Sequence, residues 1–290
     1  MSLEKNKNVH LMLDKMDFPN HGEGEPWLAH VAYADWTDGH NHVMHRHKDI
    51  SEIFILLHGS GKYSIGGRLY DLRAGDIVLC NPDVMHDEFP DKCPVYDTLA
   101  IGIRGLALPG LKPGQLIGAA RIPVLRRSSR TEDLRDLCLL IMKYASPGPL
   151  RNPRLIHRLL LAALDLLKDL VRQAEATEQE IDPLCVAVEQ YLNDHFGEDV
   201  SLEETAKRFF VSTWHLSRLF KRETSYNFKQ YLLRLRLGEA QVRLTVTDDS
   251  IGDIALACGF HDPAYFTRLF SRHIGLPPSR YRQLRTADRE

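Results

Sequence analysis

The last third of this 290-residue chain carries one helical pattern twice, about fifty positions apart. Each copy begins with a serine that precedes acidic residues, at Ser201 and again at Ser250, which is typical of a helix start. Further along each copy, apolar residues and arginines recur at helical spacing. The matching residues are Leu216, Arg218, Leu219, Phe220, Arg222 and Tyr231 in the first copy and Phe266, Arg268, Leu269, Phe270, Arg272 and Tyr281 in the second. The repeat therefore predicts two copies of one small helical unit.

The second copy reads as two helices joined by a tight turn. Gly259 stands where a residue in the left-handed conformation would end the first helix. Asp262 is expected to cap the second helix, and Pro263 fills its first position, where a missing N–H costs nothing. The face opposite the apolar residues holds Ala264, Thr267, Arg268 and Ser271. This arrangement is a helix-turn-helix, in which the second helix can enter the major groove of DNA.

The duplicated unit also predicts which residues read DNA. The two recognition helices are expected near residues 213–222 and 263–273. Arg218 and Arg268 are the predicted base or phosphate contacts, because arginine can bind guanine edges with two hydrogen bonds. The full predicted DNA-binding set is Trp214, Ser217, Arg218, Lys221, Ala264, Tyr265, Thr267 and Arg268. The other basic residues are expected to form a solvated face that touches phosphates in part; they are Arg222, Lys229, Arg234, Arg236 and Arg272.

A single helix from Phe228 to about Thr245 is predicted between the two units. At about 1.5 Å per residue it would be ~26 Å long, which would hold the recognition helices about one DNA turn, ~34 Å, apart. One chain could therefore read two successive segments of major groove. The charge distribution supports this hypothesis, because residues 201–285 hold 14 Lys and Arg against 8 Asp and Glu, a net charge of +6, while the remainder carries −8.

Upstream of the helical third, the hydrophobic pattern has a period of two. Short apolar runs at residues 53–57, 77–80 and 99–103 are bounded by glycine, proline or aspartate. Such runs predict an all-β barrel or a jelly roll of two sheets. Residues 1–25 are polar and poorly patterned, and we interpret them as an N-terminal arm.

Helical patterning begins again after the predicted barrel. Two helices are expected at residues 131–146 and 153–174, and their leucines cover more than one face, so that one side can pack on the barrel and another on a partner. A polar stretch then separates the two halves of the chain. The predicted architecture is α+β and multi-domain: a β-barrel or jelly-roll domain with its two helices, 1–176; a linker, 177–182; and an all-α domain with two helix-turn-helix motifs, 183–290.

A histidine-rich motif lies within the predicted barrel. Gly39, His45, His47, Glu52 and Gly59 follow the spacing G-x5-H-x-H-x4-E-x6-G. Two histidines at i and i+2 of a strand point to the same side, so that one ligand can meet both rings. A carboxylate and a third imidazole would complete a site for a divalent transition metal. The spacing matches the first motif of the cupin superfamily.

The second cupin motif is matched more loosely, by Gly75, Pro82 and His86, because Asn81 stands where proline is usual. The resemblance implies that Zn, Ni, Fe or Mn would be held by His45, His47, Glu52 and His86. Two alternatives stay open, since the same side chains could contact an organic effector or hydrogen-bond one another. Aromatic residues could line the barrel for a sugar-like effector or form ordinary core; they are Trp27, Tyr33, Trp36, Phe54 and Tyr63.

The second helix-turn-helix resembles the signature of the AraC/XylS family of bacterial transcription regulators. The motifs are I-A-x-x-x-G-F at 254–260, F-x-R-x-F at 266–270 and G-x-x-P-x-x-Y-R at 275–282. The resemblance implies a sequence-specific regulator with a cupin-like sensor domain, controlled by a small effector in the barrel. Its implied partners are double-stranded promoter DNA, RNA polymerase and a second copy of the chain, which would dimerise through the helices at 131–146 and 153–174.

A metal-dependent cupin enzyme is the competing hypothesis. The histidine motif favours an enzyme, but a duplicated DNA-reading unit is not expected of one, so the sequence favours a regulator that is not an enzyme. Five cysteines without a C-x-x-C pair fit a reducing cytoplasm. Asp165, Lys168 and Asp169 interrupt the most apolar run, which argues against a membrane span.

Overall fold

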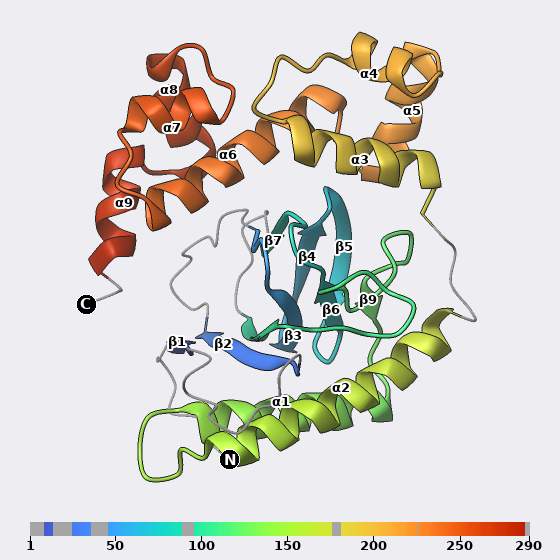
Figure 1. Cartoon of the computed structure of the whole chain (residues 1–290), viewed down its shortest axis with the longest axis vertical. Coiled ribbons are helices and arrows are strands. Elements are labelled where there is room, and N and C mark those ends of the chain that lie inside the picture. The colour runs from blue at the N-terminus through green and yellow to red at the C-terminus, as the bar shows by residue number, and fades with distance from the viewer. Residues whose placement is uncertain are drawn as a thin grey trace.

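The computed structural model describes residues 9–13, 25–35, 46–88, 96–175, 181–224 and 226–287. Figure 1 shows three layers. A β-domain lies in the middle, the two long helices that follow it in sequence cover one side, and the helices of the last third lie on the other side. The predicted α+β architecture is therefore confirmed.

Antiparallel strands build the middle layer. They are β1 (Val9–Met12), β2 (Trp27–Asp35), β3 (Ser51–His58), β4 (Ser60–Ile65), β5 (Arg68–Arg73), β6 (Ile77–Cys80), β7 (His86–Glu88), β8 (Asp97–Arg104) and β9 (Val124–Leu125). One sheet has the order β1-β2-β8-β3-β6-β9 and the other the order β5-β4-β7. The two sheets confirm the predicted cupin-like domain. Residues 9–12, which belong to the expected N-terminal arm, pair with β2.

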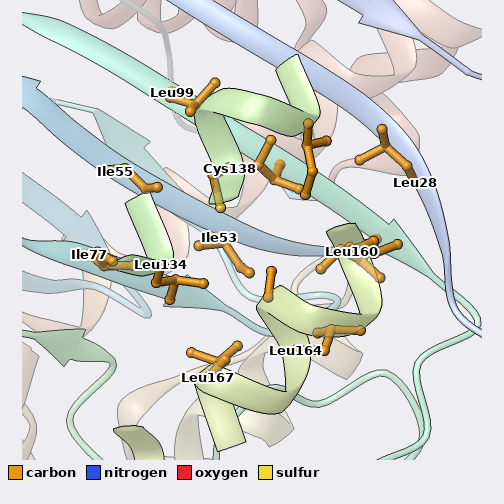
Figure 2. Close-up of a cluster of buried hydrophobic side chains, with 14 of the residues drawn as sticks. Leu28, Ile53, Ile55, Ile77, Leu99, Leu134, Cys138, Leu160, Leu164 and Leu167 are labelled. Carbon is orange, nitrogen blue, oxygen red and sulfur yellow. The ribbon is translucent and has the colours of Figure 1, made fainter. Parts of the chain in front are cut away.

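Helices α1 (Ser129–Ala145) and α2 (Pro153–Glu175) cover the outer face of the larger sheet. Ser128 and Thr131 form a capping box at the start of α1, each side chain accepting a hydrogen bond from the other residue's backbone N–H. Figure 2 shows the apolar contact between helices and sheet, made by Leu134, Cys138, Leu160, Leu164 and Leu167 on one side and Leu28, Ile53, Ile55, Ile77 and Leu99 on the other. The two predicted helices are confirmed, and most of their apolar surface packs on their own sheet.

A second apolar cluster fills the space between the sheets. Phe54 and Tyr63 are fully buried there, with ring centroids 4.5 Å apart. Trp27 and Tyr33 belong instead to the cluster on the outer face of the larger sheet. Trp36 lies outside the described residues. The four candidate aromatic residues that the structure describes, Trp27, Tyr33, Phe54 and Tyr63, therefore belong to apolar core clusters.

The last third folds as two small helical units on one long helix. Its helices are α3 (Pro183–His195), α4 (Leu202–Arg208), α5 (Thr213–Thr224), α6 (Phe228–Val246), α7 (Ile251–Ala257), α8 (Pro263–Ile274) and α9 (Pro278–Ala287). One apolar core surrounds Leu216, Phe220 and Tyr231 at the first half of α6, and another surrounds Leu244 and Phe266 at its second half. The predicted helix-turn-helix units and the helix between them are confirmed.

Local signals explain where the helices of the second unit begin and end. The Ser250 hydroxyl accepts a hydrogen bond from the Asp253 N–H at 3.1 Å, and the Asp262 carboxylate accepts one from the Ala264 N–H at 2.8 Å. Gly259 has a φ of 79°, as the turn requires. In the first unit Phe210 takes this left-handed position with a φ of 56°, and its side chain is 96% exposed. The glycine signal is therefore present in only one of two equivalent turns.

Little of the predicted linker, residues 177–182, is described. Its last residue, Asp182, caps α3 by accepting a hydrogen bond from the Leu184 N–H at 2.9 Å. Across the described parts of the chain, no helix combines the length and the apolar character that crossing a bilayer requires.

Candidate functional site

The first recognition helix, α5, presents one exposed polar face. Trp214, Ser217, Arg218 and Lys221 are exposed at helical spacing, while Leu216, Leu219 and Phe220 are buried on the other side. The Arg218 guanidinium lies 4.8 Å from the centre of the Trp214 ring. This stacking can restrict the arginine before it meets a base or a phosphate.

The second recognition helix, α8, repeats the arrangement with smaller residues. Ala264, Tyr265 and Arg268 are exposed, and Arg268 lies 5.8 Å from the centre of the Tyr265 ring. Thr267 is half-buried, and its hydroxyl donates a hydrogen bond to the Pro263 carbonyl at 2.9 Å. The second helix therefore offers fewer side chains to the bases than the first, which suits a role in positioning the protein on DNA.

The expectation of one solvated basic face was partly wrong. Arg222, Lys229 and Arg272 are exposed, but Arg234 and Arg236 are not. Arg234 donates to the Asp87 carboxylate of the β-domain at 2.8 Å, and Arg236 donates to the backbone carbonyls of Phe196 and Glu198. The cause is tertiary packing. Because α6 packs on other elements along most of its length, Arg234 and Arg236 find hydrogen-bond partners within the protein.

The histidine cluster lies at one end of the space between the two sheets. His30, Gly102, Glu52 and Cys80 are neighbours in one cross-strand row of the larger sheet, since each pairs with the next. A side chain at Gly102 would lie 2.2 Å from His30 Nδ1, so glycine leaves the room that the imidazole needs. His30 Nε2 thereby reaches Glu52 Oε2 at 2.9 Å.

Two further imidazoles complete the cluster. His47 Nε2 lies 3.7 Å from Glu52 Oε2, and His86 Nε2 lies 3.7 Å from Glu52 Oε1. His86 Nδ1 is 3.0 Å from the Val84 carbonyl, which can only accept a hydrogen bond, so Nδ1 donates to it and the contact fixes the orientation of the ring. His47 is the least buried of the four, with a side chain 28% exposed.

The carboxyl group of Glu52 is held in its ionised form. Burial alone would raise the pKa of Glu52, but the hydrogen bond with His30 and the charges of His86, His30 and His47 hold the pKa well below its usual value. A buried carboxylate surrounded by imidazoles is a donor set that suits a divalent transition metal.

The distances also fit a metal ion. Ligand atoms of His30, His47 and Glu52 lie within 4.8 Å of one another, and so do those of Glu52, Cys80 and His86. Ligands about 2.1 Å from a tetrahedral metal would be ~3.4 Å apart, close to the 3.7 Å separations that Glu52 makes with His47 and His86. Each of these two groups therefore has a spacing that fits such an ion, and Glu52 belongs to both.

The observed cluster and the predicted ligand set have His47, Glu52 and His86 in common. The predicted ligand His45 lies outside the described residues. His30 is not among the predicted ligands, because it lies one strand before the histidine motif in the sequence. The sequence does carry a signal for His30. This residue lies on the same side of strand β2 as Ala32 and Ala34, so the alternation of side chains along the strand predicts that His30 faces the interior of the barrel.

Comparison with known proteins decides between a regulator and an enzyme. The family model for the AraC-like ligand binding domain matches residues 28–179, and the model for a helix-turn-helix domain matches residues 205–284. The chain belongs to the AraC family. It is therefore a DNA-binding transcription regulator with an N-terminal ligand-binding domain, which favours the regulator hypothesis over a cupin enzyme.

Two relatives of similar length, HTH-type transcriptional activators named RhaS, support this membership. The transcriptional activator RhaS of Escherichia fergusonii is 31% identical over 83% of this chain and 88% of its own length. RhaS of Citrobacter koseri is 30% identical over 95% of this chain and 98% of its own. Among solved structures, the C-terminal domain of AraT from Geobacillus stearothermophilus covers 36% of this chain and 88% of its own at 32% identity, with a TM-score of 0.36.

Replacing Arg218 by alanine should weaken specific DNA binding by ~1–3 kcal/mol, about 5- to 150-fold, because an arginine exposed on a recognition helix is expected to bond a base edge. Fluorescence anisotropy at fixed salt, on operator DNA and on random DNA, measures this loss. Arg280→Ala, which removes an exposed charge of α9 in the same domain, serves as the control. An equal loss on both DNAs would assign Arg218 to phosphate contact instead of base reading.

Proposed function

We propose that this AraC-family regulator activates transcription when a divalent transition metal binds His30, His47, Glu52 and His86. The observation that carries the proposal is the donor set itself: the imidazoles of His30, His47 and His86 all lie within 3.7 Å of one buried carboxylate, that of Glu52. When bound, the metal would supply positive charge that links the two sheets and the segment before β3. We propose no catalytic role for the cluster.

Activation is the proposed sign of regulation because the RhaS relatives carry that name and match most of both chains. An activator bound near a promoter requires a contact with RNA polymerase, which we propose as a partner. A protein that acts on promoter DNA in a bacterium works in the cytoplasm, which is the proposed location.

Metal binding can be tested with Co²⁺, whose visible absorption reports the ligands. The full-length chain should bind one ion, and His86→Ala or Glu52→Gln should weaken binding by more than about 100-fold, since changing even an outer partner of a metal site costs about 10- to 100-fold. His58→Ala is the matched control, because His58 is an exposed histidine of β3 that pairs with Asp97 outside the cluster. Absence of bound cobalt in the wild-type chain would contradict the proposal.

We also propose that the chain dimerises through the outer surface of α1 and α2. Most apolar residues of these helices pack on their own sheet, but the Leu140 side chain stays 40% exposed on α1. Leu140→Glu should convert a dimer into a monomer in sedimentation equilibrium, because a charge in an apolar contact is left without a partner. Leu256→Glu, at an exposed leucine of α7, should leave the mass unchanged. A wild-type monomer at micromolar concentration would contradict the proposal.

A further inference from the structure

Among the residues that the structure describes, three ion pairs join the β-domain to the DNA-binding domain. Arg46 donates to Glu239 of α6 at 2.7 Å, and Arg68 pairs with Glu189 of α3 at 2.8 Å. Asp87 accepts from Arg234 of α6 at 2.8 Å. Five of the six residues are buried, and Arg234 is half-buried. Buried pairs of this kind fix one relative arrangement of the groups they join, because any other arrangement would leave a buried charge without its partner.

Apolar contact fills the space between these ion pairs. Met85 of the β-domain lies within the core cluster of the first helix-turn-helix unit, together with Tyr231 and Leu235 of α6. Gly67 packs against the buried Tyr231 ring so closely that a side chain there would lie 2.2 Å from Tyr231 Cε2. The β-domain therefore completes the core on which the first recognition helix is built.

The segments that make this interface also carry the histidine cluster. Arg46 precedes His47 in the chain, and Met85 and Asp87 flank His86. Neighbouring side chains of an extended strand point to opposite sides, so His86 faces Glu52 while Met85 and Asp87 face the helices. The two segments are also tied to each other, because Arg46 pairs with Asp83 at 2.9 Å and the Asp83 N–H donates to the His47 carbonyl at 2.7 Å.

We propose that this interface is the route by which metal at the cluster controls DNA binding: an ion held at Glu52, the carboxylate that both His47 and His86 approach, fixes Arg46, Met85 and Asp87 in the positions that dock α6. The inference rests on the proposed metal-binding function, and it adds how bound metal would regulate DNA binding. It also assigns a role to the arginine–carboxylate pairs of the interface. Neither the reading of DNA nor the binding of metal would by itself require these pairs.

The docked arrangement is the one that favours DNA. The reading residues Trp214, Arg218 and Arg268 stay exposed in it, so the β-domain does not cover them. Figure 1 shows α4, α7 and α8 farther from the β-domain than α3 and α6, and α5 approaches the β-domain at its last residue, Thr224, beside Gly67. Docking therefore restrains the helix that spaces the two recognition helices without blocking either, and metal should raise DNA affinity. Since coupling between two sites is reciprocal, DNA should raise metal affinity by the same factor.

The experiment measures operator affinity of the full-length chain with and without Co²⁺, on DNA selected from random sequence by the cobalt-loaded protein. Cobalt absorption reports site occupancy in the same samples. Coupling free energies between sites commonly correspond to about 5- to 150-fold in affinity. The wild-type chain should therefore bind operator at least about fivefold more tightly with cobalt than without it.

A glycine pair provides the test variant and its control. Gly67→Ala places a methyl group into Tyr231 and should separate the domains, although it touches neither the cluster nor the reading faces. Gly110→Ala, the control, introduces a methyl group at another left-handed position of the same domain, where no atom lies within 4 Å. Glu239→Gln is a second variant that removes one ion-pair charge without changing shape, and Asp83 remains as a partner for Arg46.

The expected result is that Gly67→Ala and Glu239→Gln bind cobalt as the wild-type chain does but lose the cobalt effect on DNA, whereas Gly110→Ala keeps it. If cobalt binds and both variants keep the full effect, the interface proposal is wrong while the metal proposal stands. A cobalt-induced decrease in wild-type DNA affinity would also overturn it, because the docked form would then not be the DNA-binding form. If the wild-type chain binds no cobalt, the metal proposal fails and this inference fails with it.

Discussion

The burial of helix α6 is the constraint on which the rest of the structure depends. From Tyr231 to Thr245 none of its residues is exposed, because three neighbours cover it. The core of the first helix-turn-helix unit packs on its first half, the core of the second unit on its second half, and the β-domain reaches Arg234 and Glu239 between them. A helix covered on so many sides cannot rotate or bend without disturbing both recognition units.

The arrangement of the sensor domain depends on the pairing register of its strands, just as the position of α6 depends on its burial. His30 reaches Glu52 only because Gly102 lies between them in the cross-strand row. A slip of one residue would turn His30 and Glu52 to the helix-covered face, where each would be a buried polar group in an apolar cluster. The same register therefore builds the apolar contact with α1 and α2 and collects the ionisable residues on the inner side.

Local chemistry made the helical third predictable. Ser250, Asp262 and Gly259 act within a few residues of themselves, so their caps and turn could be inferred from the sequence and are found in the structure. His30 and the pair of Arg46 with Glu239 could not, because they depend on which strand or helix lies beside them, 22 and 193 positions away. Arg234 was expected in solvent because the sequence around a charged helical residue does not reveal whether a carboxylate from a distant part of the chain, here Asp87, will lie beside it.

Hydroxyl-radical footprinting of the full-length chain on a single operator half-site tests most directly whether α6 makes one reading unit of the two recognition helices. The account predicts two protected backbone segments on one side of the duplex, about 10 base pairs apart, since that is one helical turn. A single protected segment, or two segments separated by about half a turn and therefore on opposite sides, would contradict it.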